Sequence, residues 1–169
     1  MFVESISLRG GKQHNREGFS LPVFLGFVLG TLAIGGLGAL LGGTGNYAAI
    51  VKPPLSPPAI VFPIAWSILY LMMGTAAYLA WQANATERSG ALRFYLAQLI
   101  VNMLWPFFFF RLEWRLFAFF WLLLLAALLS LTMIGFRYLS KPAFSLLIPY
   151  ALWLVFAGYL NLGTYFLNA

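Results

Sequence analysis

Five apolar stretches of about twenty residues each constrain the fold of this chain more than any other feature. They run approximately over residues 19–41, 58–83, 91–110, 116–136 and 142–167. A helix needs about twenty apolar residues to cross a bilayer, where only helices and closed barrels satisfy every backbone polar group. None of the stretches shows the two-residue alternation of a barrel strand. The sequence therefore predicts an all-α membrane protein, a bundle of five transmembrane helices.

The charged residues agree with a membrane location and argue against other classes of protein. They form only 8% of the chain, whereas soluble domains carry about a quarter. The ten Lys and Arg residues are dispersed between apolar stretches, which disfavours nucleic-acid binding. We expect residues 1–18 to form a polar, flexible tail, and the apolar run after it is too long for a signal peptide. With no Cys and few carboxylates or imidazoles, we expect no disulfide, metal site or cofactor.

The distribution of positive charge predicts the orientation of the helices. One side of the predicted membrane holds seven basic residues and the other holds three, and cytoplasmic loops carry the excess of Lys and Arg. We therefore expect the N-terminus in the cytoplasm, with the C-terminus and the long first loop, residues 42–57, outside. The seven are Arg9, Lys12, Arg16, Arg88, Arg93, Arg137 and Lys141, and the three are Lys52, Arg111 and Arg115.

Aromatic and polar side chains recur three or four residues apart in three of the predicted helices, so each set shares a helical face. Pro106 and Pro149 each remove a backbone hydrogen bond beside such a face and should bend the helix. Amides and bends are costly in lipid unless they face protein or a cavity. The faces comprise Phe62, Trp66, Tyr70, Met73 and Ala77; then Asn102, Trp105 and Phe109; then Tyr150, Trp153, Ala157 and Asn161.

These faces predict a cavity for a flat, largely apolar ligand, held by stacking on Trp and Tyr. A metal-free porphyrin fits this description, and Lys52 is placed to contact a propionate. For Asn102 and Asn161, an interhelical hydrogen bond is an equally good interpretation. No predicted span contains Asp, Glu, Lys, His or Cys, which disfavours acid–base catalysis and proton-coupled pumping.

Glycines four residues apart recur in the first predicted span, as Gly26 with Gly30 and as Gly38 with Gly42. Small residues at this spacing let another helix approach closely. We expect packing inside the bundle in preference to a dimer contact.

Three motifs make the chain resemble the TspO/translocator protein family, also called tryptophan-rich sensory proteins. They are KPPLSPPAIVFPIAWSILYLMMGTAAYLAW, NMLWPFFF and PYALWLVFAGYLN, in a match that extends from about Phe19 to Asn161. The resemblance implies a five-helix membrane protein, usually a homodimer, that binds porphyrins in a pocket capped by the first loop. At matching positions, the pocket residues would be Tyr47, Pro57, Trp66, Tyr70, Asn102, Trp105, Trp153, Ala157 and Leu160.

Two of the places where the chain departs from the family bear on ligand binding. Leu55 stands where members usually have Trp, so the loop is expected to seal the pocket less tightly. No Lys or Arg follows Lys141, so the sterol motif of animal members is not supported.

We therefore expect an integral membrane receptor or carrier for porphyrins, with a role in tetrapyrrole or stress signalling and with lipid and a second copy as partners. One alternative is light-dependent porphyrin degradation, reported for some bacterial members, with Trp66 and Trp153 at the matching positions. Another is a structural or assembly subunit that binds protein through its aromatic faces.

Overall fold

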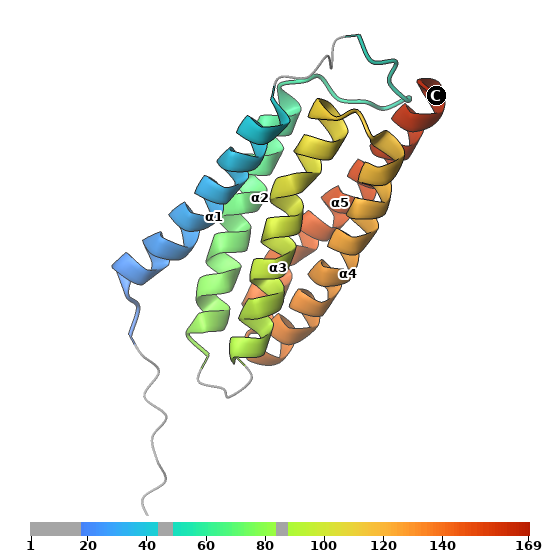
Figure 1. Cartoon of the computed structure of the whole chain (residues 1–169). Helices are drawn as coiled ribbons and strands as arrows, with labels where there is room; N and C mark the ends of the chain where they lie inside the picture. The colour runs from blue at the N-terminus through green and yellow to red at the C-terminus, as the bar shows by residue number, and fades with distance from the viewer. Residues whose placement is uncertain (1–17, 44–48, 84–87) are drawn as a thin grey trace, which may run out of the picture.

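Five long helices form a bundle in the computed structural model, which describes residues 18–43, 49–83 and 88–169 (Figure 1). The helices are α1 (Leu21–Gly42), α2 (Val61–Trp81), α3 (Arg88–Pro106), α4 (Arg115–Leu139) and α5 (Lys141–Leu167), with a π-helical turn η1 (Phe107–Arg111) after α3. With η1 counted as the end of α3, their ends differ from the predicted spans by no more than three residues. The predicted all-α, five-helix bundle is confirmed.

Each helix, with η1 counted as the end of α3, is long and apolar enough to cross a membrane, with mean hydropathy between 1.3 and 2.5. Large apolar side chains cover the outside of the bundle, as Leu40 and Val155 illustrate at 76% and 75% exposed. In water such a surface would be unfavourable, but hydrocarbon solvates it. The chain is therefore built as an integral, multi-pass membrane protein.

The helices close into a ring in the order α1, α2, α5, α4, α3, with α3 packed again on α1. The ring brings α2 beside α5, although α3 and α4 lie between them in the sequence. It also places the aromatic faces of α2, α3 and α5 around one interior. The candidate site described below depends on this closure.

Two glycine pairs of α1 have different surroundings. A Cβ at Gly38 would lie 2.8 Å from the backbone oxygen of Met103, and one at Gly42 would lie 2.7 Å from Pro106. Gly26 and Gly30 have no such neighbour in the described chain. The expected packing inside the bundle therefore holds for the second pair, and the first pair faces outward.

The end of α3 changes to π geometry directly after Pro106. Pro106 has no N–H to donate to the Asn102 carbonyl, and the next turn is wider, with the Leu112 N–H bonded to the Phe107 oxygen at 3.0 Å. Glu113 then adopts a left-handed φ of 56°. At Pro149 the α-helix continues without a change of type, and the bend there stays a prediction.

We predict that Gly38→Ala lowers the thermal stability of the purified protein, because the added methyl group meets the Met103 backbone of α3. Overpacking of this kind costs about 1–3 kcal/mol. The matched control is Gly36→Ala on the same helix, where a Cβ meets nothing within 4 Å. Melting in detergent should show a lower midpoint for the first variant only. Equal midpoints for the two variants would contradict the close packing of α1 on α3.

Candidate ligand-binding site

Trp66 on α2 is the centre of an aromatic wall built from α2 and α5. Its ring stacks on Tyr70 one turn further along, with centroids 5.5 Å apart. It meets Tyr150 and Trp153 of α5 edge-on, at 6.0 and 6.4 Å. Trp105 on α3 faces the same interior and stacks on Phe109 at 4.9 Å. Rings predicted separately on three helices therefore surround one space.

A cavity of about 220 Å³ lies between these rings and the small residues of α1. Gly35, Ala39 and Gly43 leave the room that bulkier residues on α1 would fill. The lining is predominantly apolar, with Asn102 and the Tyr70 hydroxyl as polar groups. The lining residues are Gly35, Ala39, Gly43, Phe62, Pro63, Trp66, Tyr70, Asn102, Trp105, Pro106, Phe110, Leu122, Leu125 and Ala157.

A second, smaller chamber of about 40 Å³ adjoins the first, beside the described part of the first loop. The two share a wall made of Phe62, Trp66, Trp105, Phe110 and Ala157. The small chamber is more polar, since Lys52, Ser56, Asn161 and Thr164 line it, together with Phe109, Trp153 and Leu160. Among the described residues no acidic side chain lines either space, and Lys52 is the one charged residue of this part of the chain on their walls.

A chain of buried hydrogen bonds links the polar side chains beside the larger cavity. The Tyr70 hydroxyl donates to Asn102 Oδ1 at 2.7 Å, and the Asn102 amide donates to the Tyr150 hydroxyl at 2.6 Å. The Tyr150 hydroxyl in turn donates to Gln98 Oε1 at 3.2 Å. These bonds join α2, α3 and α5. They hold the helices that carry the aromatic wall in a fixed relation.

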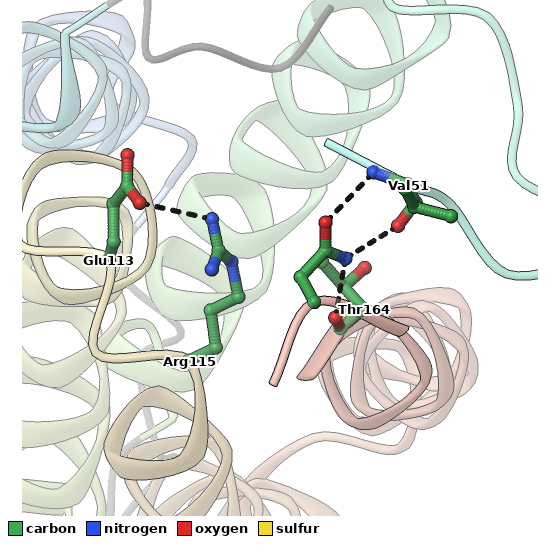
Figure 2. Close-up of polar contacts among 5 residues, drawn as sticks. Val51, Glu113, Arg115 and Thr164 are labelled. Atoms are coloured by element: carbon green, nitrogen blue, oxygen red, sulfur yellow. Dashed lines mark hydrogen bonds and ion pairs between the residues drawn. The ribbon is translucent and has the colours of Figure 1, made fainter. Parts of the chain in front are cut away.

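The described part of the first loop is fastened to α5. The Asn168 side chain accepts from the Val51 N–H at 3.0 Å and donates to the Val51 and Thr164 carbonyls at 2.8 and 2.7 Å (Figure 2). The Tyr159 hydroxyl donates to the Pro54 carbonyl at 2.8 Å. These contacts hold the loop over the small chamber.

The neighbouring end of α4 carries the Glu113–Arg115 ion pair, at 3.2 Å, also drawn in Figure 2. Among the described residues, no three His, Cys, Asp or Glu side chains come close enough to hold a metal ion. The chemistry of this site therefore depends on rings, amides and one cation.

Comparison with known proteins gives the family. The TspO/MBR family model matches residues 24–167. This chain belongs to the TspO/MBR family. It is 37% identical to the translocator protein of Ovis aries, over 85% of this chain and 84% of the relative. It is 38% identical to the tryptophan-rich protein TspO of Chlorobaculum tepidum, over 72% and 78%, and 35% identical to the tryptophan-rich sensory protein of Cereibacter sphaeroides, over 86% and 91%.

Most of the predicted ligand residues of this TspO/MBR chain lie at the two chambers. Trp66, Trp105 and Ala157 line both. The larger cavity adds Tyr70 and Asn102, and the smaller one adds Trp153, Leu160 and Lys52. Pro57 lines neither, and Tyr47 lies outside the described residues.

Leu55, where the family usually has Trp, has a left-handed φ of 64° and is 84% exposed. It lines neither chamber. That the loop seals less tightly stays a prediction.

Sequence reasoning missed several residues of the site. The α1 residues Gly35, Ala39 and Gly43 carry no chemical signal, because small apolar residues are common in any span. Leu122 and Leu125 of α4 could not be recognised in the sequence for the same reason. Gln98 was detectable, since it lies four residues before Asn102 on the same face of α3.

We predict that Tyr150→Phe lowers the free energy of unfolding by about 1–2 kcal/mol, because it leaves the Asn102 amide and Gln98 Oε1 without their partner. The control is Tyr138→Phe, which removes a hydroxyl from a residue that is 80% exposed and should change stability by less than about 0.5 kcal/mol. Denaturant titration in micelles measures both. A loss as large for Tyr138→Phe would show that the buried network is not the cause.

Proposed function

We propose that this protein is a membrane receptor or carrier that binds porphyrins or related flat, apolar molecules in the two chambers. The observation that carries the proposal is the convergence of Trp66, Trp105 and Trp153, from three helices, on linked cavities. Indole rings offer large flat faces for stacking on a macrocycle. The apolar lining removes the macrocycle from water, and the few polar groups fix its orientation.

The size of the cavity sets a condition on this proposal. At about 220 Å³, the larger space is below the roughly 300–1,000 Å³ of typical ligand pockets. A whole tetrapyrrole therefore requires the two chambers to merge and the merged space to widen further. Rotation of the Phe62 and Phe110 side chains, which belong to their shared wall, is the simplest way to join them.

The orientation and the oligomeric state also belong to the proposal. In the described chain the basic residues divide four to three between the two ends, so the charge bias depends on Arg9, Lys12 and Arg16, which lie outside the described residues. We propose a cytoplasmic N-terminus and a homodimer. The outward-facing Gly26 and Gly30 would permit close contact with a second copy.

We predict that Trp153→Ala weakens protoporphyrin binding roughly 10- to 100-fold, because stacking and buried apolar area worth about 1.5–3 kcal/mol are lost. Quenching of the remaining tryptophan fluorescence in a titration of detergent-purified protein measures the affinity. Trp114→Ala is the control, since Trp114 is 55% exposed and lines neither chamber.

Unchanged affinity in Trp153→Ala would remove the assignment of the site. Absence of quenching in the unsubstituted protein would favour the structural or assembly role. Loss of porphyrin absorbance on illumination, abolished in Trp66→Phe, would favour the degrading enzyme.

We predict that Lys52→Ala weakens porphyrin binding about fivefold, because a charge contact with a propionate at a partly exposed site contributes about 1 kcal/mol. A neutral steroid of similar area should bind the variant and the unsubstituted protein equally. Competition against a fluorescent porphyrin gives both constants. Equal losses for porphyrin and steroid would reject a charge-pairing role for Lys52.

A further inference from the structure

Three residues that line the small chamber carry polar atoms without a hydrogen-bond partner in the described chain. They are the indole Nε1 of Trp105, the indole Nε1 of Trp153, and both Nδ2 and Oδ1 of Asn161. Asn161 as a whole is 1% exposed. The walls of the chamber therefore contain residues with N–H donors for which the described chain supplies no acceptor.

Such atoms are unusual, because a buried donor without an acceptor costs about 1–3 kcal/mol and native proteins leave few of them. Elsewhere the same bundle satisfies comparable groups. The Asn102 side chain makes two hydrogen bonds, and the Trp121 indole donates to the Val101 carbonyl at 2.7 Å. The unsatisfied groups also include Gln98 Nε2 and Arg115 Nε, but only the small chamber brings several together.

The other polar groups of the chamber do not supply the missing acceptor. Thr164 and Ser56 use their hydroxyls as donors to the Leu160 and Pro53 carbonyls, at 2.6 and 2.7 Å. Lys52 adds a positive charge, and no carboxylate of a described residue lines the space. A ligand group that suits this wall must bring acceptor oxygens and can be anionic.

We propose that the small chamber binds a carboxyl group of the ligand, with the N–H groups of Trp105, Trp153 and Asn161 as donors. This rests on the proposed function and adds the chemical class that the site selects: a flat apolar body that carries a carboxyl-bearing arm. The carboxyl oxygens accept from the three N–H groups. In its protonated form, the O–H of the same group can also donate to Asn161 Oδ1.

The volumes of the two chambers agree with a carboxyl group in the small one and the apolar body of the ligand in the larger one. About 40 Å³ is room for a few heavy atoms, since a single water needs about 10–15 Å³ on this measure. A ring does not fit there, but a carboxyl group does. The apolar body then lies in the larger cavity across the shared wall. Neutral esters and sterols would leave the indole and amide groups without a full set of partners.

The experiment compares protoporphyrin IX with its dimethyl ester, which keeps the macrocycle and removes both acids. Each is titrated by fluorescence quenching in the same detergent, against the unsubstituted protein, Asn161→Leu, Trp153→Phe, Lys52→Ala and Trp114→Phe. The quantity compared is the ratio of the ester dissociation constant to the acid dissociation constant. Partition into micelles cancels when this ratio is compared between variants.

We expect the unsubstituted protein to bind the acid at least about tenfold more tightly than the ester, as for a hydrogen bond to a charged group. Asn161→Leu and Trp153→Phe should bring the ratio closer to the one set by micelle partition. Trp114→Phe should leave it unchanged, because Trp114 lines neither chamber.

Equal affinities for acid and ester in the unsubstituted protein would overturn this inference while the proposed function stands, and this comparison needs no variant to fold. A preference that disappears in Lys52→Ala but persists in Asn161→Leu and Trp153→Phe would also overturn it, since the cation alone would then explain the selectivity. Binding of neither probe would refute the proposed function itself.

Discussion

The absence of water in the hydrocarbon core is the constraint on which this structure depends. Each polar group placed there needs a partner within the chain or remains unsatisfied. The helices meet that demand for the backbone, and the Tyr70–Asn102–Tyr150–Gln98 chain meets part of it for side chains. Because these bonds cross from α2 to α3 to α5, satisfying the polar groups also fixes the helices around the cavity.

Close helix packing and an open interior come from the same distribution of small and large residues. Glycines at positions 38, 42 and 74 bring α1 against its neighbours. Gly35 leaves space for the Tyr70 ring, which a Cβ at that position would meet. The rings that line the cavities are carried instead by α2, by α3 with η1, and by α5. Hydrocarbon gives little drive for helices to associate, so this shape complementarity has to hold the ring together.

The sequence predicted the helices, and the faces that carry the rings, because both follow from periodicity. It did not predict which helices are neighbours. The bond between Tyr70 and Asn102 depends on the ring order, and so does the contact of Trp66 with Trp153, 87 positions further along. The hydrogen bond between Asn168 and Val51 could not be predicted for the same reason. The sequence shows a polar residue at position 168 but does not indicate which residue it bonds to. The backbone conformation of Leu55 could not be predicted either. Its left-handed φ is imposed by the course of the loop, and leucine is not a residue type that favours this conformation.

For Asn102 and Asn161 the structure distinguishes between two interpretations that the sequence alone could not decide. Each was expected either to bond between helices or to contact a ligand. Asn102 makes both of its hydrogen bonds to tyrosines, whereas the equally buried Asn161 has no hydrogen-bond partner among the described residues. Under the function proposed above, stability and binding are divided between neighbouring levels of one bundle. The satisfied amide holds the helices, and the unsatisfied one, beside two indole N–H groups, would serve the ligand. Unsatisfied groups of this kind persist in native proteins mainly where function uses them.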